Sequence, residues 1–318
     1  MSPEPGRGRY PHLNGGYSYR ERVRPGGAGL SVPDYYARFY PHSDRPTWAA
    51  RLLAGEIELE GRPAQAGDIL TAGARLVWHR PPWTEPAVPT EFSVLYEDRD
   101  LLAVCKPPGL PTLPAGGFLD QTLLTLLRRR WPAATPLHRL GRGTSGLVLC
   151  GLNAQATARL LADWRSGQVE KRYRALSAGV APGNSYDIAV PIGPVAHPKL
   201  GQVYAASESG KAAYSRARVL ARRTDSTLFE VDILTGRPHQ IRIHLAAAGW
   251  PLVGDPLYVA GGHPRGDAVP GDLGYWLHAE RLRVVHPRTR VPLTLYAPVP
   301  PTLEVEETPG TGEGARQV

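Results

Sequence analysis

The chain has 318 residues, 42% of them hydrophobic, which is enough for one large domain with a smaller partner and for a buried core. Its formal net charge is +8, and only four of the 37 basic residues are lysine, which leaves 33 arginines. Arginine binds phosphate bidentately and stacks on bases, so this bias favours an RNA partner, although a GC-rich genome produces it too. Two cysteines exclude a disulfide framework, and neither a membrane-length apolar stretch nor a secretory signal is present, so a cytoplasmic protein is expected.

The two ends of the chain differ from the rest in composition. Residues 1–28 are rich in Gly, Pro, Arg and Tyr without apolar periodicity, and residues 303–318 are rich in Gly, Glu and Thr. Both are predicted to be disordered tails, because neither carries enough apolar residues to form a core. The basic front tail either contacts RNA or is an inert extension, and both readings stay open.

Residues 29–80 are predicted to form a small α/β unit. A helical pattern at residues 48–53 is followed by strand patterns at 57–60 and 75–79. The helix, the G-x-I-x-x-x-G segment and the G-D turn occur in an order that resembles the S-four-type RNA-binding domain. The proline-rich residues 81–90 are predicted to be a stiff linker.

Residues 91–302 are predicted to form one larger α+β domain. A hairpin is expected over residues 93–104, and the apolar run 147–150 indicates a buried strand. Asn153 is placed to cap a helix, and an alternating pattern over residues 229–233 indicates a half-buried strand.

The most informative motif is H-R-L-G-R-G-T-S-G-L at residues 138–147. Its core also spells G-x-G-x-x-G, which in a dinucleotide site follows an apolar strand and opens a helix. Here a strand pattern follows, so a nucleotide site is disfavoured. The motif resembles the H-R-L-D-x-x-T-S-G-L signature of RluA-type pseudouridine synthases, which isomerise uridine in RNA. In this resemblance the catalytic aspartate falls on Gly141, which has no side chain to act as nucleophile or acid.

Three further motifs carry the same resemblance in the family's order. Residues 95–109 resemble Y-E-D-x-x-L-x-V-x-K-P-x-G, and residues 170–175 resemble K-x-Y-x-A. Residues 234–245 match T-G-R-x-H-Q-I-R-x-H-L, and a G-D-x-x-Y turn follows at 254–258. The resemblance implies an α+β fold in which flanking helices and a mixed, mainly antiparallel sheet surround a central RNA cleft.

The resemblance also implies roles for single residues. Tyr173 would stack on the extruded base and take part in the last proton transfer, while Arg242 would hold the catalytic carboxylate ionised. With Gly141 opposite, Arg242 loses that partner at a cost of roughly 3 to 5 kcal/mol, so substrate phosphate, an anion, water or another carboxylate should compensate. Lys106 would approach RNA phosphate or support the loop. The other residues expected to bind RNA or line the uridine pocket are Arg139, Thr144, Ser145, Arg237, Leu147 and Ile241.

The implied function is conversion of specific uridines to pseudouridine in ribosomal or transfer RNA, by a monomer that needs neither cofactor nor metal. His239 and His244 lie five apart, which on a strand places them on opposite faces, so a shared metal is not expected. Two hypotheses remain. One is an active isomerase that uses a carboxylate from elsewhere or a changed first step, and the other is a degenerate relative that binds and remodels RNA. The missing nucleophile favours the second, but the otherwise intact motifs lead us to prefer the first.

Overall fold

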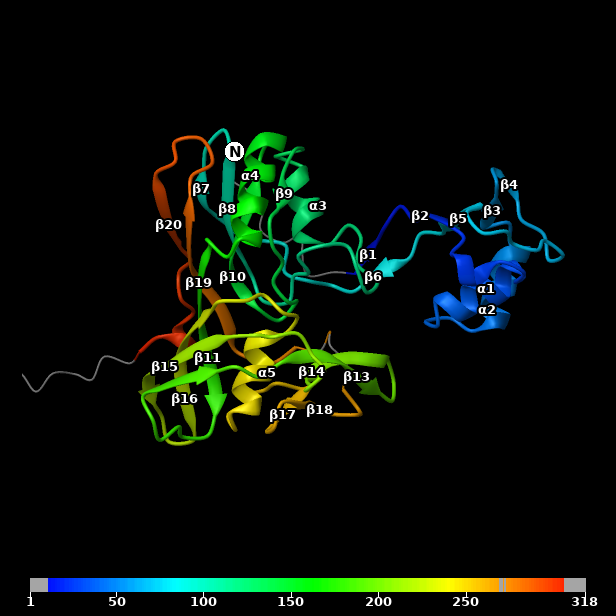
Figure 1. The fold of residues 1–318 in the computed structure, drawn as a ribbon. Coiled ribbons are helices and arrows are strands. Elements are labelled where there is room, and N and C mark those ends of the chain that lie inside the picture. Colours follow the sequence, from blue (N-terminus) through cyan, green and yellow to red (C-terminus); the bar gives the residue numbers. More distant parts are fainter. Residues whose placement is uncertain (1–10, 269–270, 272, 306–318) are drawn as a thin grey trace, which may run out of the picture. The chain divides into compact units, whose positions relative to one another are not determined.

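The computed structural model describes residues 11–268, 271 and 273–305, and the chain divides into two compact units (Figure 1). One unit is Pro11–Pro86, and the other contains the chain from Ala87 onward. Within the described part of the chain, no helix has both the length and the apolar character needed to cross a membrane.

The Pro11–Pro86 unit contains a four-stranded antiparallel sheet in the order β2-β5-β3-β4. The Asp44 carboxylate caps helix α2 by accepting a hydrogen bond from the Thr47 amide at 3.0 Å, and Trp48 of that helix stacks on Tyr36 in the core. The elements are β1 (His12–Leu13), β2 (Tyr17–Arg22), η1 (Pro25–Gly27), α1 (Val32–Phe39), α2 (Arg45–Leu53), β3 (Ile57–Leu59), β4 (Arg62–Pro63), β5 (Arg75–Arg80) and β6 (Thr84–Glu85).

The structure corrects both expected boundaries of this unit. The prediction of a disordered tail over residues 1–28 is wrong from residue 11 onward, because β2 pairs with β5 along its whole length. Residues 1–10 lie outside the described residues. The side chains of β2 are polar or aromatic and mostly exposed, so no apolar pattern marked the strand. The linker expected at 81–90 is wrong at its start, since β6 pairs with β1 and Glu85 is fully buried against the Asn14 amide.

The second unit is built on a ten-stranded sheet in the order β12-β15-β16-β11-β19-β10-β8-β7, with β20 beside β19 and β9 beside β10. Every pair is antiparallel except β10 with β19, so the expected mixed, mainly antiparallel α+β fold is confirmed. The strands are β7 (Ser93–Glu97), β8 (Leu101–Lys106), β9 (Thr135–Pro136), β10 (Ser145–Gly151), β11 (Glu170–Ala178), β12 (Ser185–Ile188), β15 (Ser215–Arg222), β16 (Ser226–Ile233), β19 (Leu277–Val285) and β20 (Pro292–Tyr296).

The parallel pair explains one glycine of the loop motif. Gly146 lies opposite Ala279, and a Cβ on Gly146 would lie 2.3 Å from the Ala279 carbonyl oxygen. Its φ of 105° is also one that L residues with a side chain rarely adopt. The glycine of T-S-G is therefore required by strand pairing.

Helices and small strands complete the unit. The helices are α3 (Leu123–Arg128), α4 (Ala154–Arg165) and α5 (Gln240–Ala247). Two hairpins lie near α5 (Figure 1): β13 (Ile192–His197) with β14 (Gly201–Ala206), and β17 (Tyr258–Val259) with β18 (His263–Pro264). The turn η2 (Pro301–Leu303) follows β20. The predicted cap is confirmed, because the Asn153 side-chain oxygen accepts from the Ala156 amide at 2.9 Å. Leu303 is buried, so the expected tail at 303–318 is wrong at its first residue; residues 306–318 are outside the described part.

Helix α5 contradicts the strand reading of the fourth motif. Ile241 and Ile243 alternate with polar residues, which resembles a strand, but all residues from Gln240 to Ala246 are buried. A helix buried on all sides shows no amphipathic period, and packing rather than pattern decides its structure. His239 precedes this helix and His244 lies within it, so the argument about opposite strand faces does not apply.

Candidate active site around Gly141

Lys106 holds the loop that carries Gly141. Lys106 is fully buried at the end of β8, and its Nζ donates to the carbonyls of Pro107, Leu110 and Arg142 at 2.8, 2.7 and 3.2 Å. Burial lowers the pKa of Lys106 to about 7, while the three acceptors match the three N–H bonds of the ammonium form. Lys106 thus supports the loop through Arg142, and the expected contact with RNA phosphate is wrong because its amino group is enclosed.

Tyr275, which the sequence analysis missed, fills the space beside Gly141. Gly141 is exposed and its φ lies outside the left-handed region, so its backbone accepts a side chain. A Cβ on Gly141 would lie 3.0 Å from the Tyr275 hydroxyl and 3.4 Å from Thr144 Oγ1. A Cβ on Gly143 would lie 2.8 Å from Cζ of the same ring. The two glycines of G-R-G indicate that a bulky side chain packs against the loop, but nothing in the sequence identifies that side chain as Tyr275.

Arg242 has a carboxylate partner. Its Nε and Nη2 donate to the two oxygens of Asp255 at 2.7 and 2.6 Å, and both side chains are almost fully buried. Burial alone would lower the pKa of Arg242, but the bonds to Asp255 outweigh it and the pKa is raised. The guanidinium lies 4.2 Å from the Tyr275 ring centre and 5.0 Å from that of Tyr258. The sequence analysis expected substrate phosphate, an anion, water or another carboxylate to compensate the charge of Arg242. The structure contains another carboxylate, that of Asp255.

Asp255 balances the charge of Arg242 but is not placed to act as the expected catalytic carboxylate. One of its oxygens accepts from Arg242 and from the amides of Leu257 and Tyr258 at 2.9 and 3.1 Å. The other oxygen accepts from Arg242, and the side chain has no exposed surface. A carboxylate with several donors and no access to substrate is a poor nucleophile, so Asp255 serves as the fixed counter-ion of Arg242.

His239 is a neutral neighbour of this pair. Its Nδ1 lies 2.8 Å from the Tyr258 hydroxyl, which itself donates to the Tyr204 carbonyl at 2.7 Å, so Nδ1 carries the hydrogen. Burial and the nearby Arg242 lower the pKa of His239 to about 4. The positive charge of the exposed Arg139 also lowers the pKa of His239. Arg139 makes no hydrogen bond or ion pair within the described residues, so it is a free cation beside the loop.

Tyr173 lies on β11 with an unbonded hydroxyl. It is 8% exposed, burial raises its pKa to about 12, and no described residue hydrogen-bonds to its hydroxyl. Tyr173 is paired with Ala279, which is paired in turn with Gly146 of β10. Both neighbours are small, and the β11–β19 register shifts between Arg172 and Tyr173. A bulge at this position changes the direction of the strand locally, and the Tyr173 ring is part of the main hydrophobic core.

The remaining expected residues are mostly fixed by the fold. Thr144 Oγ1 bonds to the Tyr275 hydroxyl at 3.3 Å, and Ser145 Oγ to His278 Nδ1 at 2.9 Å. Arg237 donates from Nε to the Ala212 carbonyl at 2.9 Å but stays partly exposed. Leu147 and Ile241 are both buried in the main core. The structure therefore gathers Gly141, Thr144 and Arg242 around Tyr275.

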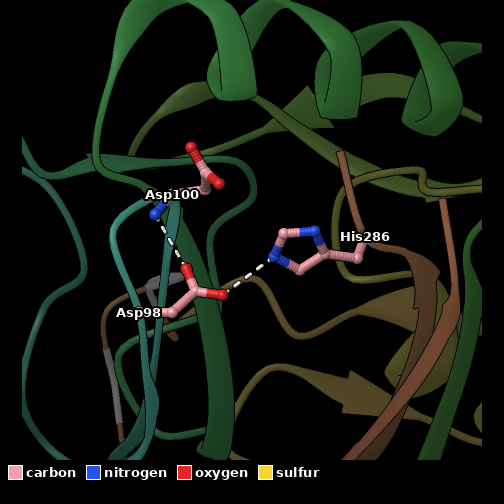
Figure 2. A group of neighbouring side chains, drawn as sticks. All are labelled: Asp98, Asp100 and His286. Atoms are coloured by element: carbon pink, nitrogen blue, oxygen red, sulfur yellow. Dashed lines mark hydrogen bonds and ion pairs between the residues drawn. The ribbon is translucent and has the colours of Figure 1, made fainter. Parts of the chain in front are cut away.

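A second cluster, Asp98, Asp100 and His286, has the composition of a metal site (Figure 2). Asp98 already accepts from the Tyr96 hydroxyl, from His286 Nε2 and from two backbone amides. Asp100 accepts from Asn153 and Arg288. The carboxylate oxygens of this cluster are therefore engaged in hydrogen bonds within the protein. These bonds stabilise the turn of the Y-E-D segment between β7 and β8 and connect it to the end of β19.

The fold and the motifs together define a pseudouridine synthase domain. The family model described as RNA pseudouridylate synthase matches residues 100–247. An uncharacterised RNA pseudouridine synthase of Synechocystis is 44% identical over 86% of this chain and 96% of its own length. Ribosomal large subunit pseudouridine synthase D of Pseudomonas aeruginosa is 33% identical over 86% and 89%.

A plant relative and a solved structure agree. RNA pseudouridine synthase 5 of Arabidopsis thaliana is 36% identical over 96% of this chain and 99% of its own length. The structure of human RNA pseudouridylate synthase domain containing 1 matches with a TM-score of 0.52 and 28% identity, over 69% of this chain and 89% of that one. The chain belongs to the RluA-type family of RNA pseudouridine synthases.

The half-buried His138 predicts a pH-dependent stability. His138 stacks on Trp164 and its Nε2 accepts from the Leu149 amide, and burial lowers its pKa to about 3. In the unfolded chain this pKa is about 6.5. The unfolded state therefore binds the extra proton, and the free energy of unfolding falls as the pH drops from about 6.5 toward 3, by up to about 1.4 kcal/mol per pH unit for this residue.

His138→Gln tests this prediction, because Gln can still accept from Leu149 but does not titrate. Denaturant unfolding at pH 7, 6, 5 and 4 should show a shallower pH slope in the variant. Equal slopes in both proteins would mean that folding does not lower the pKa of His138.

Proposed function

We propose that the protein isomerises uridine to pseudouridine in RNA, ribosomal or transfer RNA being the substrate class. The observation that carries the proposal is what surrounds Gly141: Arg242 has a buried carboxylate partner in Asp255, and the Tyr275 hydroxyl would lie 3.0 Å from a Cβ on Gly141. The Arg242 guanidinium also lies 4.2 Å from the ring centre of Tyr275, so a fixed cation and a hydroxyl both lie near residue 141, which supports a retained reaction site. The name of the Pseudomonas relative, a ribosomal large subunit enzyme, supports ribosomal RNA.

The reaction explains why no cofactor or metal is proposed. Uridine and pseudouridine are isomers, so the bond from N1 to the ribose breaks and a bond from C5 forms without any net oxidation. The protein must extrude the base, hold the ribose and move protons. We take it to act as a cytoplasmic monomer, as composition and resemblance suggest.

The alternative is a catalytically degenerate relative that binds and remodels RNA. One observation favours it: among the described residues no carboxylate oxygen lies within 4 Å of a Cβ built on Gly141, and Asp255 is enclosed. Under this hypothesis Tyr275 is a plug that closes the former active site.

The two candidate functions predict different chemistry for the wild-type protein. Transcripts of ribosomal RNA and a pool of transfer RNA, made with 5-tritiated uridine, are incubated with the full-length chain. An isomerase releases tritium as the C5 proton is lost, and mass spectrometry of cyanoethylated RNA counts the pseudouridine formed. Binding of these RNAs without tritium release or pseudouridine would leave the degenerate binder as the function.

We propose that Tyr173 stacks on the extruded uracil. Tyr173→Ala is expected to weaken binding of RNA with an accessible uridine by roughly 1 to 3 kcal/mol, the usual loss for one base on an aromatic ring. Tyr173→Phe should retain most of the affinity, because the ring is kept. Filter binding at fixed salt measures both. Equal losses would assign the effect to the hydroxyl, and no loss in either would place Tyr173 in the core alone.

We propose that the Pro11–Pro86 unit is an S-four-like RNA-binding module. Tyr17 and Tyr19 are exposed on β2, and the Arg80 guanidinium lies 3.5 Å from the Trp83 ring centre. Exposed rings combined with arginine suit contacts to RNA bases and phosphates.

A fragment of residues 87–318 tests the module, because the chain divides at Pro86 into units with separate cores. The fragment should unfold cooperatively but bind structured RNA more weakly than the full chain at matched salt. An insoluble fragment, or one with unchanged affinity, would contradict this division of labour.

A further inference from the structure

The Tyr275 hydroxyl lies near the position that a carboxylate at residue 141 would take. A carboxylate oxygen lies two bonds, about 2.4 Å, from its Cβ. The Tyr275 oxygen lies 3.0 Å from a Cβ built on Gly141, and no other atom of Tyr275 comes within 4 Å of that Cβ. The ring thus approaches residue 141 with its reactive atom alone.

The slot for this ring depends on the G-R-G sequence. A Cβ on Gly143 would lie 2.8 and 2.9 Å from Cζ and Cε1 of Tyr275, so the end of the ring would have to shift if residue 143 had a side chain. Thr144 then orients the hydroxyl through the 3.3 Å contact between their oxygens. Two glycines, a threonine and a tyrosine more than 130 residues away form one arrangement.

We propose that Tyr275 is the nucleophile of the isomerisation, in place of the aspartate; this rests on the proposed function. Its oxygen attacks C1′ of the target ribose as the C1′–N1 bond breaks, and the phenolic proton passes to N1 of the departing uracil. The uracil turns, C5 attacks C1′, and the bond from C1′ to the tyrosine oxygen breaks. The proton lost from C5 then returns to the tyrosine oxygen. Atoms and electrons balance without a further reactant.

General chemistry supports a tyrosine in this role. Tyrosine is among the side chains that form covalent intermediates, and it is the nucleophile of some enzymes that cleave glycosidic bonds. The Arg242 guanidinium lies 4.2 Å from the Tyr275 ring centre and is held there by Asp255. A fixed cation at this distance stabilises the negative charge that the ring gains each time the bond to C1′ breaks.

The other tyrosines near the site do not fit this role. The Tyr258 hydroxyl already donates to the Tyr204 carbonyl and accepts from His239, so its hydrogen and one lone pair are engaged. Tyr173 has an unbonded hydroxyl, but residue 141 has no contact with it within 4 Å of the Cβ position. Tyr275 alone among the described tyrosines meets that position.

Tyr275→Phe is the direct test, because it removes one oxygen and keeps the ring that packs on Gly143 and Arg242. Tritium release from 5-tritiated uridine in ribosomal and transfer RNA transcripts should fall by about a thousandfold or more, as expected for loss of a nucleophile. Its melting temperature should stay close to that of the wild type. Tyr186→Phe is the control, since it removes the hydroxyl of a half-buried tyrosine that accepts one backbone hydrogen bond, from the Gly183 amide, and it should keep the wild-type rate.

Two further variants separate chemistry from structure. Thr144→Val breaks the same hydrogen bond from the other side and keeps the Tyr275 hydroxyl, so it should lose far less activity than Tyr275→Phe. Gly141→Asp with Tyr275→Phe places a carboxylate where the hydroxyl was and should recover part of the rate lost in Tyr275→Phe. Equal losses in Thr144→Val and Tyr275→Phe, or no recovery in the double variant, overturn the proposal.

The outcomes also distinguish this inference from the proposed function. If wild type releases tritium and Tyr275→Phe does so equally fast, the protein is a synthase and Tyr275 is not its nucleophile. If wild type releases none from any RNA that it binds, the proposed function fails and the nucleophile with it.

Discussion

The buried ion pair between Arg242 and Asp255 is the interaction on which the site depends. Both side chains are almost fully buried, so removing either one would leave an uncompensated charge at a cost of roughly 3 to 5 kcal/mol. The pair joins helix α5 to the turn that precedes β17, and Tyr258 and Tyr275 both lie against the guanidinium. Because Asp255 satisfies Arg242 without any help from residue 141, the fold tolerates glycine there. Glycine at residue 141 therefore leaves no unpaired charge on Arg242.

The loop keeps its shape through contacts that do not involve the missing side chain. Lys106 and the Gly109 amide both donate to the Arg142 carbonyl, and Gly146 fixes the loop to β19 through a backbone approach that no side chain would allow. Tyr275 then closes the space above Gly143. Since the backbone is held independently, a reactive group can arrive from another segment without moving the loop. This is the physical condition for exchanging one nucleophile for another within a single fold.

Local patterns predicted elements of the fold, and non-local packing decided the rest. The strand at 147–150 and the cap at Asn153 could be predicted because a continuous apolar run and a side-chain cap are properties of neighbouring residues. Helix α5 could not, because it is buried on nearly every residue and its isoleucines alternate as in a strand. Strand β2 was missed for the opposite reason, since its polar and aromatic side chains face solvent and its partner is β5, more than 50 residues later.

The candidate site shows the same limit more sharply. Gly141 was identified because a resemblance assigns chemistry to its position, yet the residue that meets it, Tyr275, lies outside every motif. The contact between Thr144 and Tyr275 spans 131 residues. What the sequence does contain is the second glycine: a single lost aspartate explains Gly141 but leaves Gly143 unexplained, whereas a ring that packs over the loop requires Gly143 and fills the position beside Gly141. Both glycines are therefore explained by one contact, the packing of the Tyr275 ring against the loop.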